Sequence, residues 1–179
     1  MALRKVFQEG EDILRKKARP VERFDDRLAE LAQDMLETMK EENGVGLAAT
    51  QVGILKQMFV MNLGDEVPEE LQGDFVIVNP KISNTAGEQE LIEGCLSLPG
   101  LYAHVKRPEK LTLHYQDLEG KEHEMDLSGF PAVCVCHETD HLHGILFRDK
   151  ASEPLFRLDA EGRPQTAKVA QVQDDGSEI

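Results

Sequence analysis

The feature that most constrains the fold of this chain is the segment His137-Glu138-Thr139-Asp140-His141, which fits the pattern H-E-x-x-H. On an α-helix, residues four apart lie on one face and are separated by about 6 Å along the axis. A helix therefore lets His137 and His141 hold one metal ion between them, with Glu138 beside that face, where its carboxylate could reach a metal-bound water. The same pattern also arises by chance on ordinary surface helices, so its context must decide between the two interpretations.

The sequence around the motif favours a short, half-buried helix. Residues 130–136 are apolar and include Pro131, which suits the first turn of a helix. Gly144 follows shortly after the motif, at a place where a helix would end. We therefore predict a helix that begins between residues 127 and 131 and ends between residues 142 and 144.

A catalytic metal site of the zinc type needs about three protein ligands and leaves one position for water. The cysteines are Cys95, Cys134 and Cys136. Cys134 lies on the face of the predicted helix that carries the histidines, but it is about 10 Å along the axis from His141, and Cys136 points to another face. We interpret these two as small buried apolar residues. Cys95 lies in the segment 93–100, bounded by Gly and Pro, where an extended backbone can bring a thiolate close to another element.

Length, charge and cysteine content narrow the class of protein further. A chain of 179 residues is expected to form one domain and to bury about 70% of its unfolded surface. No apolar run is long enough to span a bilayer, and charges from Arg4 onward interrupt any signal-peptide core. Three cysteines argue against a disulfide framework and suit a reducing cytoplasm. The net charge of -14 disfavours direct nucleic-acid binding. We expect a cytoplasmic protein with neither a nucleic-acid nor a membrane partner.

The periodicity of apolar residues predicts an α+β organisation. Residues 25–42 have the pattern of an amphipathic helix near the N-terminus, and a shorter helix is expected at residues 11–17. Strands are expected at residues 57–62, 75–79, 101–105, 110–116 and 121–127, with a hairpin turn at 118–121. The motif helix follows the strands, so we expect it to pack against an antiparallel sheet. We assign residues 1–150 to a single catalytic domain and 151–179 to a C-terminal tail that is partly ordered or disordered.

Three segments together resemble the peptide deformylase family in order and spacing. They are Gly44-Val45-Gly46-Leu47-Ala48-Ala49-Thr50-Gln51, which resembles G-x-G-L-A-A-x-Q; Glu93-Gly94-Cys95-Leu96-Ser97, which resembles E-G-C-L-S; and residues 137–144, which resemble H-E-x-D-H-L-x-G. The resemblance runs from about residue 5 to residue 150 and is far more specific than H-E-x-x-H alone. It implies antiparallel sheets packed around a central helix that carries the H-E-x-x-H motif.

The resemblance implies a hydrolase that removes the formyl group from the N-terminal N-formylmethionine of newly synthesised polypeptides and releases formate. Its metal ligands would be Cys95, His137 and His141, with Fe(2+) expected in the cell and Zn(2+), Ni(2+) or Co(2+) possible in purified protein. A metal-bound water would attack the formyl carbonyl, with Glu138 as general base and then general acid. Its partners would be N-formylmethionyl nascent polypeptides and, transiently, the ribosome.

The resemblance also assigns the remaining site residues. The side-chain amide of Gln51 and the backbone N–H of Leu96 would stabilise the negative oxygen that forms during attack. A pocket for the substrate would be lined by Val45, Gly46, Leu91, Gly94, Phe130, Val133 and Cys134, although the helical spacing of the last three is equally that of plain core. The substrate backbone could pair as an added strand beside residues 44–46 and 100–103.

Five residues complete the comparison with the family pattern. Glu93 is expected to pair with Arg107, and Asp140 to orient a ligand histidine or to hold the helix in place. The chain departs from the pattern at Cys136, where the family commonly has Gln, and at Tyr102, where some members have Arg. These departures bear on substrate affinity and leave the ligands and the base unchanged.

Two other classes of function fit the H-E-x-x-H pattern. A zinc peptidase would usually take its third ligand from a downstream His or Glu, so the upstream Cys95 argues against it. A non-catalytic module with a structural metal would close its site with four ligands and would leave Glu138 without a role.

Overall fold

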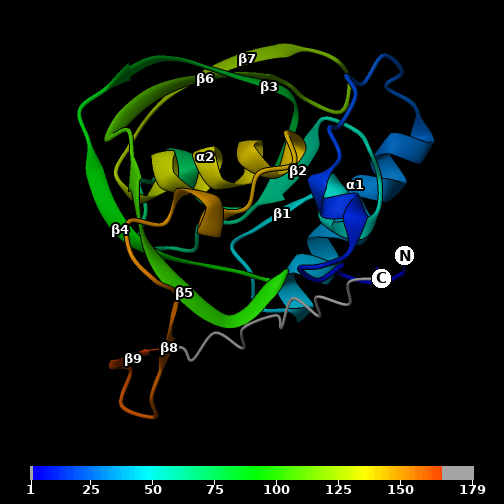
Figure 1. Ribbon diagram of the computed structural model, residues 1–179. Coiled ribbons are helices and arrows are strands. Elements are labelled where there is room, and N and C mark those ends of the chain that lie inside the picture. Colours follow the sequence, from blue (N-terminus) through cyan, green and yellow to red (C-terminus); the bar gives the residue numbers. More distant parts are fainter. Residues whose placement is uncertain (1, 167–179) are drawn as a thin grey trace, which may run out of the picture.

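The H-E-x-x-H segment forms helix α2 (Phe130–Leu142), which lies inside two curved antiparallel sheets (Figure 1). The computed structural model describes residues 2–166. The first sheet has the order β1-β2-β3-β6-β7, formed by Gly46–Ala48, Met58–Met61, Phe75–Ala86, Lys110–Gln116 and Glu122–Ser128. The second has the order β4-β5-β8-β9, formed by Gln89–Cys95, Leu98–Arg107, Phe156–Leu158 and Pro164–Thr166. The predicted α+β fold with a central motif helix is thus confirmed.

Helix α2 is enclosed because its sequence is apolar on nearly every side. Pro131 lies in the first turn, and the residues from Pro131 to Glu138 are all buried. The preceding Gly129 has a φ of 67°, a conformation that glycine adopts without strain. Beyond the helix, a Cβ at Gly144 would lie 2.5 Å from the backbone oxygen of Arg15, so only glycine fits there. The predicted helix boundaries are confirmed.

Helix α1 (Asp26–Glu41) forms as the amphipathic pattern predicts. The carboxylate of Asp25 caps its start by accepting a hydrogen bond from the backbone N–H of Leu28. Its buried face packs against β1 and β2, where it forms one apolar cluster with Leu47 of β1 and with Met58 and Val60 of β2. Four short 3-10 helices complete the helical part of residues 2–166: η1 (Asp12–Arg15), η2 (Ala49–Val52), η3 (Glu69–Leu71) and η4 (Phe147–Lys150). The helix expected at residues 11–17 is therefore only the single turn η1.

Five strands match the predicted positions, but β3 and β5 are longer than expected. Register shifts in β3 between Val78 and Lys81 and between Ser83 and Ala86 allow it to curve around the helix. Strands β1, β4, β8 and β9 were not predicted. Strands β1, β8 and β9 are only three residues long, and β8 pairs with β5, which lies far earlier in the chain. Strand β4 overlaps the segment 93–100 only at its last three residues, and that segment was expected to be extended without being assigned as a strand.

The chain after residue 150 continues into the second sheet. Strand β8 pairs with β5 at Tyr102 and Phe156. Leu155 is buried in the cluster that also contains Leu98 and Phe147, and Phe156 is buried as well. The rest of the predicted tail, residues 167–179, lies outside the described residues, and the prediction made for it stays a prediction. No helix in residues 2–166 is long and apolar enough to cross a membrane.

Candidate metal centre

Helix α2 and the β4–β5 hairpin bring three potential ligand atoms together. Cys95 is the last residue of β4, and its Sγ lies 3.3 Å from Nε2 of His141. The Nε2 atoms of His141 and His137 are 3.2 Å apart, and all three ligand atoms lie within 4.8 Å of one another. Within residues 2–166 this is the one group of three or more His, Cys, Asp and Glu residues with such spacing.

The geometry of these atoms fits a divalent transition metal ion. Two nitrogen ligands that bind a tetrahedral ion at about 2.1 Å stand about 3.4 Å apart, close to the observed separation of the two Nε2 atoms. Burial lowers the pKa of His141 well below its ordinary value, so its ring is neutral and offers a lone pair. One thiolate and two imidazoles form a donor set that suits zinc or ferrous iron.

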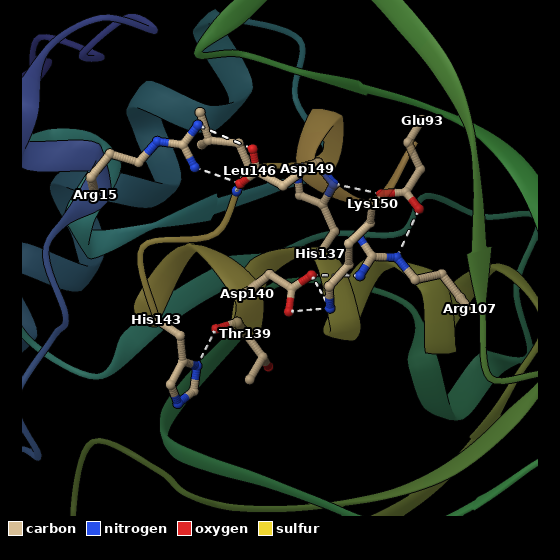
Figure 2. Close-up of polar contacts among 10 residues, drawn as sticks. All are labelled: Arg15, Glu93, Arg107, His137, Thr139, Asp140, His143, Leu146, Asp149 and Lys150. Atoms are coloured by element: carbon tan, nitrogen blue, oxygen red, sulfur yellow. Dashed lines mark hydrogen bonds and ion pairs between the residues drawn. The ribbon is translucent and has the colours of Figure 1, made fainter. Parts of the chain in front are cut away.

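A buried ion pair between Glu93 and Arg107 lies beside the metal centre and orients His137 (Figure 2). Nδ1 of His137 lies 2.8 Å from Oε1 of Glu93, and a hydrogen bond from this nitrogen to the carboxylate turns Nε2 toward the other ligands. Burial lowers the pKa of His137, but the hydrogen bonds with Cys95 and Glu93 outweigh it and raise that pKa well above its ordinary value. Arg107 donates to the same carboxylate through Nε and Nη2, each over 2.9 Å. Burial alone would raise the pKa of Glu93, but the hydrogen bonds from His137 and Arg107 outweigh it and lower that pKa. The predicted pairing of Glu93 with Arg107 is confirmed.

Glu138 lies buried against Gly46 of β1. A Cβ at Gly46 would be only 2.8 Å from Cδ of Glu138, so the strand can approach the carboxylate only because residue 46 is glycine. Oε2 of Glu138 has no hydrogen-bond partner, and burial raises the pKa of this carboxyl to about 7. A carboxyl group with this pKa can both accept and release a proton near neutral pH.

Gln51, in η2, is held beside the thiolate by two neighbours. Its Oε1 accepts a hydrogen bond from the backbone N–H of Ala48 over 2.9 Å, and its Nε2 donates to Oγ of Ser97 over 3.1 Å. The same Nε2 lies 3.5 Å from Sγ of Cys95. Leu96 occupies the β4–β5 turn between Cys95 and Ser97. Gln51 and Leu96, which the resemblance assigned to the site, thus lie beside Cys95, and their role there stays a prediction. Ser97, the last residue of the E-G-C-L-S segment, had not been assigned to the site.

A pocket of about 470 Å³ opens beside the centre. All the predicted substrate-binding residues line it, together with His137, Glu138, Gln51 and Leu96: Val45, Gly46, Leu91, Gly94, Phe130, Val133 and Cys134. Burial raises the pKa of the Cys134 thiol well above its ordinary value, so this residue is a neutral part of the wall. Ile92 and Tyr102 also line the pocket, and sequence reasoning had not assigned either to it.

The strand edges around the pocket limit where a substrate could pair. Tyr102 pairs with Gly94 on one side and with Phe156 on the other, so this residue does not offer a free edge. Strand β4 is one of the two outer strands of the second sheet, and β1 is one of the two outer strands of the first. The substrate edge expected at residues 100–103 is thus contradicted at Tyr102, because the sequence did not reveal β8, and it stays a prediction for the other residues of that range.

Comparison with known proteins agrees with this geometry. Residues 3–156 match a family model described as polypeptide deformylase. The chain is 46% identical over 154 residues to peptide deformylase 2 of Clostridium acetobutylicum, covering 86% of this chain and 98% of that protein. It is 45% identical over 175 residues to the peptide deformylase of Acetivibrio thermocellus, covering 98% and 99%.

Two solved structures show the same arrangement of the chain. The crystal structure of peptide deformylase from Thermotoga maritima matches with a TM-score of 0.80 at 36% identity, covering 86% of this chain and 100% of that one. The peptide deformylase of Synechococcus elongatus in complex with actinonin matches with a TM-score of 0.76 at 41% identity, covering 83% and 78%.

Proposed function

The chain belongs to the polypeptide deformylase family and has peptide deformylase activity, and from this we propose how its own residues carry out the reaction on formylated nascent peptides. The observation that carries the proposal is the meeting of one thiol, two imidazoles and a buried carboxyl at the wall of a single pocket. Cys95, His137 and His141 hold the metal ion in this proposal. When bound, the ion supplies a Lewis acid and lowers the pKa of a water toward about 7.

Glu138 is the group that moves the proton. Its carboxylate accepts a proton from the attacking water and later delivers it to the leaving amine. A pKa of about 7 supports both roles, because the group is then neither a permanent acid nor a permanent base at neutral pH. The close approach of Gly46 supports the proposal further, since it leaves the carboxylate little room to turn away from the pocket.

Gln51 and Leu96 stabilise the negative charge that develops on the formyl oxygen. The hydrogen bond from Ala48 fixes the orientation of the Gln51 amide, so that its N–H groups face the thiolate side. The backbone N–H of Leu96 follows Cys95 directly in the chain. Donors held in place before the reaction stabilise the developing charge without reorganisation.

The pocket receives the methionine side chain of the substrate. Val45, Leu91, Phe130, Val133 and Cys134 supply apolar walls of a size and chemistry that suit an unbranched thioether. The outer strands β1 and β4 flank the pocket, and an extended peptide backbone can pair with either as an added strand.

The resident metal and the cellular setting are also proposals. A thiolate with two imidazoles does not select one divalent metal by itself. We propose Fe(2+) in the cell, with Zn(2+), Ni(2+) or Co(2+) able to occupy the site in purified protein. Because the substrates are nascent chains, we place the protein in the cytoplasm, in transient contact with the ribosome.

One experiment tests the proposal against a peptidase. Protein purified without oxygen is assayed for formate release from formyl-Met-Ala-Ser and, in parallel, for cleavage of unformylated Met-Ala-Ser. We expect formate release without peptide-bond cleavage. Glu138→Ala should keep its metal and lose turnover, whereas Cys95→Ala should lose the metal. An active Glu138→Ala protein would refute the choice of base.

A further inference from the structure

Asp140 belongs to the motif, but its carboxylate is hydrogen-bonded to Arg107 and Lys150 and not to a ligand histidine; Figure 2 shows these two contacts. One carboxylate oxygen accepts a hydrogen bond from Nη1 of Arg107 over 2.6 Å, and the other accepts one from Nζ of Lys150 over 2.9 Å. Of the two roles expected from the sequence, direct orientation of a ligand ring is therefore wrong. The carboxylate instead joins the helix to two cations on other elements.

Arg107 divides its donors between two carboxylates. Nε and Nη2 bind Glu93, and Nη1 binds Asp140. Its side chain is 2% exposed, and burial opposes its charge, but the two carboxylates outweigh burial and raise the pKa of Arg107 above its ordinary range. A guanidinium offers these donors in one rigid plane, which a lysine cannot reproduce.

This arrangement connects the two elements that carry the ligands. Glu93 lies on β4 two residues before Cys95, and Asp140 lies on α2 directly before His141. Arg107, at the end of β5, contacts both carboxylates from one position. The distance between Cys95 and the two ligand histidines therefore depends on how α2 packs against β4 and β5.

Lys150, the second cation that binds Asp140, lies in a segment that is also attached to β5. Lys150 is the last residue of η4, and the chain that follows is bound to β5 through the backbone. The N–H of Ser152 donates to the oxygen of His104 over 2.9 Å, and Ala151 forms a bridge with Val105. Asp140 is thus held between two cations whose backbones are tied to each other.

We propose that Asp140, clamped by Arg107 and Lys150, is a positioning residue that sets α2 against the β4–β5 hairpin and so fixes the spacing of the metal ligands. The clamp governs how tightly the metal is retained, and it takes no part in the proton transfer at Glu138. The proposal rests on the metal site proposed above.

The test compares metal affinity among variants. Asp140→Asn keeps the shape of the side chain and removes its charge. Lys150→Ala removes the exposed cation, whose side chain is 43% exposed, so the fold is preserved. Lys106→Ala is the matched control, because Lys106 precedes Arg107 on β5 and forms an exposed pair with Glu88 away from the centre. Lys150→Arg tests rescue by a conservative change.

The readout is the dissociation constant of Co(2+) from each variant, measured by competition with a chromophoric chelator, with the Co(2+) absorption spectrum as a record of ligand geometry. We expect a weakening of about tenfold for Asp140→Asn, as for other residues that hold metal ligands through hydrogen bonds. For Lys150→Ala we expect about threefold, because this cation is partly exposed. Lys106→Ala and Lys150→Arg should match the parent chain. The kcat of Lys106→Ala at saturating metal should stay within about twofold of the parent.

Other outcomes overturn the proposal. Unchanged Co(2+) affinity and spectrum in both Asp140→Asn and Lys150→Ala, with only a lower Tm, would show a purely structural ion pair. If Asp140→Asn does not fold, Lys150→Ala and its control decide alone. Failure of the proposed function can be told apart from failure of the clamp proposal. If the parent chain binds metal through Cys95 but releases no formate, the proposed reaction is refuted and the proposed role of the clamp is not.

Discussion

Replacing Gly46 with alanine should separate the position of the catalytic base from the integrity of the metal centre. The added Cβ would lie 2.8 Å from Cδ and 2.9 Å from Cγ of Glu138. Carbon atoms in contact lie about 3.5–4.0 Å apart, so the Glu138 side chain must move by about 1 Å. A misplacement of this size at a reacting group costs about 100-fold in rate, or about 2.7 kcal/mol of transition-state stabilisation.

The cost in stability should be smaller than the cost in activity. The end of the Glu138 side chain borders the pocket and can move toward it. We therefore expect the free energy of unfolding to fall by about 1 kcal/mol, which is near the lower end of the range for overpacked cores. Formate release should show a fall of about 100-fold in kcat/KM at unchanged metal content. Gly64→Ala is a control for activity alone, because Gly64 lies away from the pocket, whereas its φ of 77° gives alanine a backbone strain of its own that lowers the free energy of unfolding.

A double-mutant cycle identifies the cause. If contact with Glu138 is the whole effect, the stability cost of Gly46→Ala should vanish in the Glu138→Ala background, as measured by urea unfolding. A cost that persists there would mean that the backbone of β1 is disturbed instead. Wild-type kcat/KM in Gly46→Ala would refute the reasoning altogether.

Three further predictions concern the surroundings of the site and the end of the fold. Ser97→Ala removes a hydrogen bond to Gln51 and should cost about 1 kcal/mol in urea unfolding and lower kcat more than it raises KM; a change confined to KM would contradict this. Arg107→Met should lower the free energy of unfolding by about 3–5 kcal/mol, because it leaves two carboxylates without their buried cation, and a stability equal to the parent chain would show that the pair is dispensable. Phe156→Ala should cost about 3–5 kcal/mol in the same assay, since the ring is 6% exposed; a loss under about 1 kcal/mol would place the end of the fold before β8.

The helices were predictable because their signals are local. Asp25 and the apolar residues at helical spacing define α1 within one segment, and Pro131 with the apolar run before His137 does the same for α2. Neither helix needs knowledge of its partner to be recognised, because capping and periodicity are properties of neighbouring residues.

The short strands were not predictable in the same way. Leu155 and Phe156 are two apolar residues in a polar stretch, a pattern that fits a surface loop equally well. They are buried because β8 pairs with β5 at Tyr102, far earlier in the chain. The same pairing occupies the edge of β5 at Tyr102, which is why the expected substrate edge is contradicted at that residue.

The sequence by itself determined which groups carry the chemistry. His137 and His141 share a helix face through their spacing alone, and the E-G-C-L-S and G-x-G-L-A-A-x-Q segments identify Cys95 and Gln51. Only the tertiary structure decided how those groups are held: the Gln51 amide donates a hydrogen bond to Ser97, and Arg107, whose pairing with Glu93 was expected, also binds Asp140. The physical reason is the separation of the interacting residues along the sequence. Helical spacing is set within one turn, whereas a buried charge contacts its partners only after distant strands have paired.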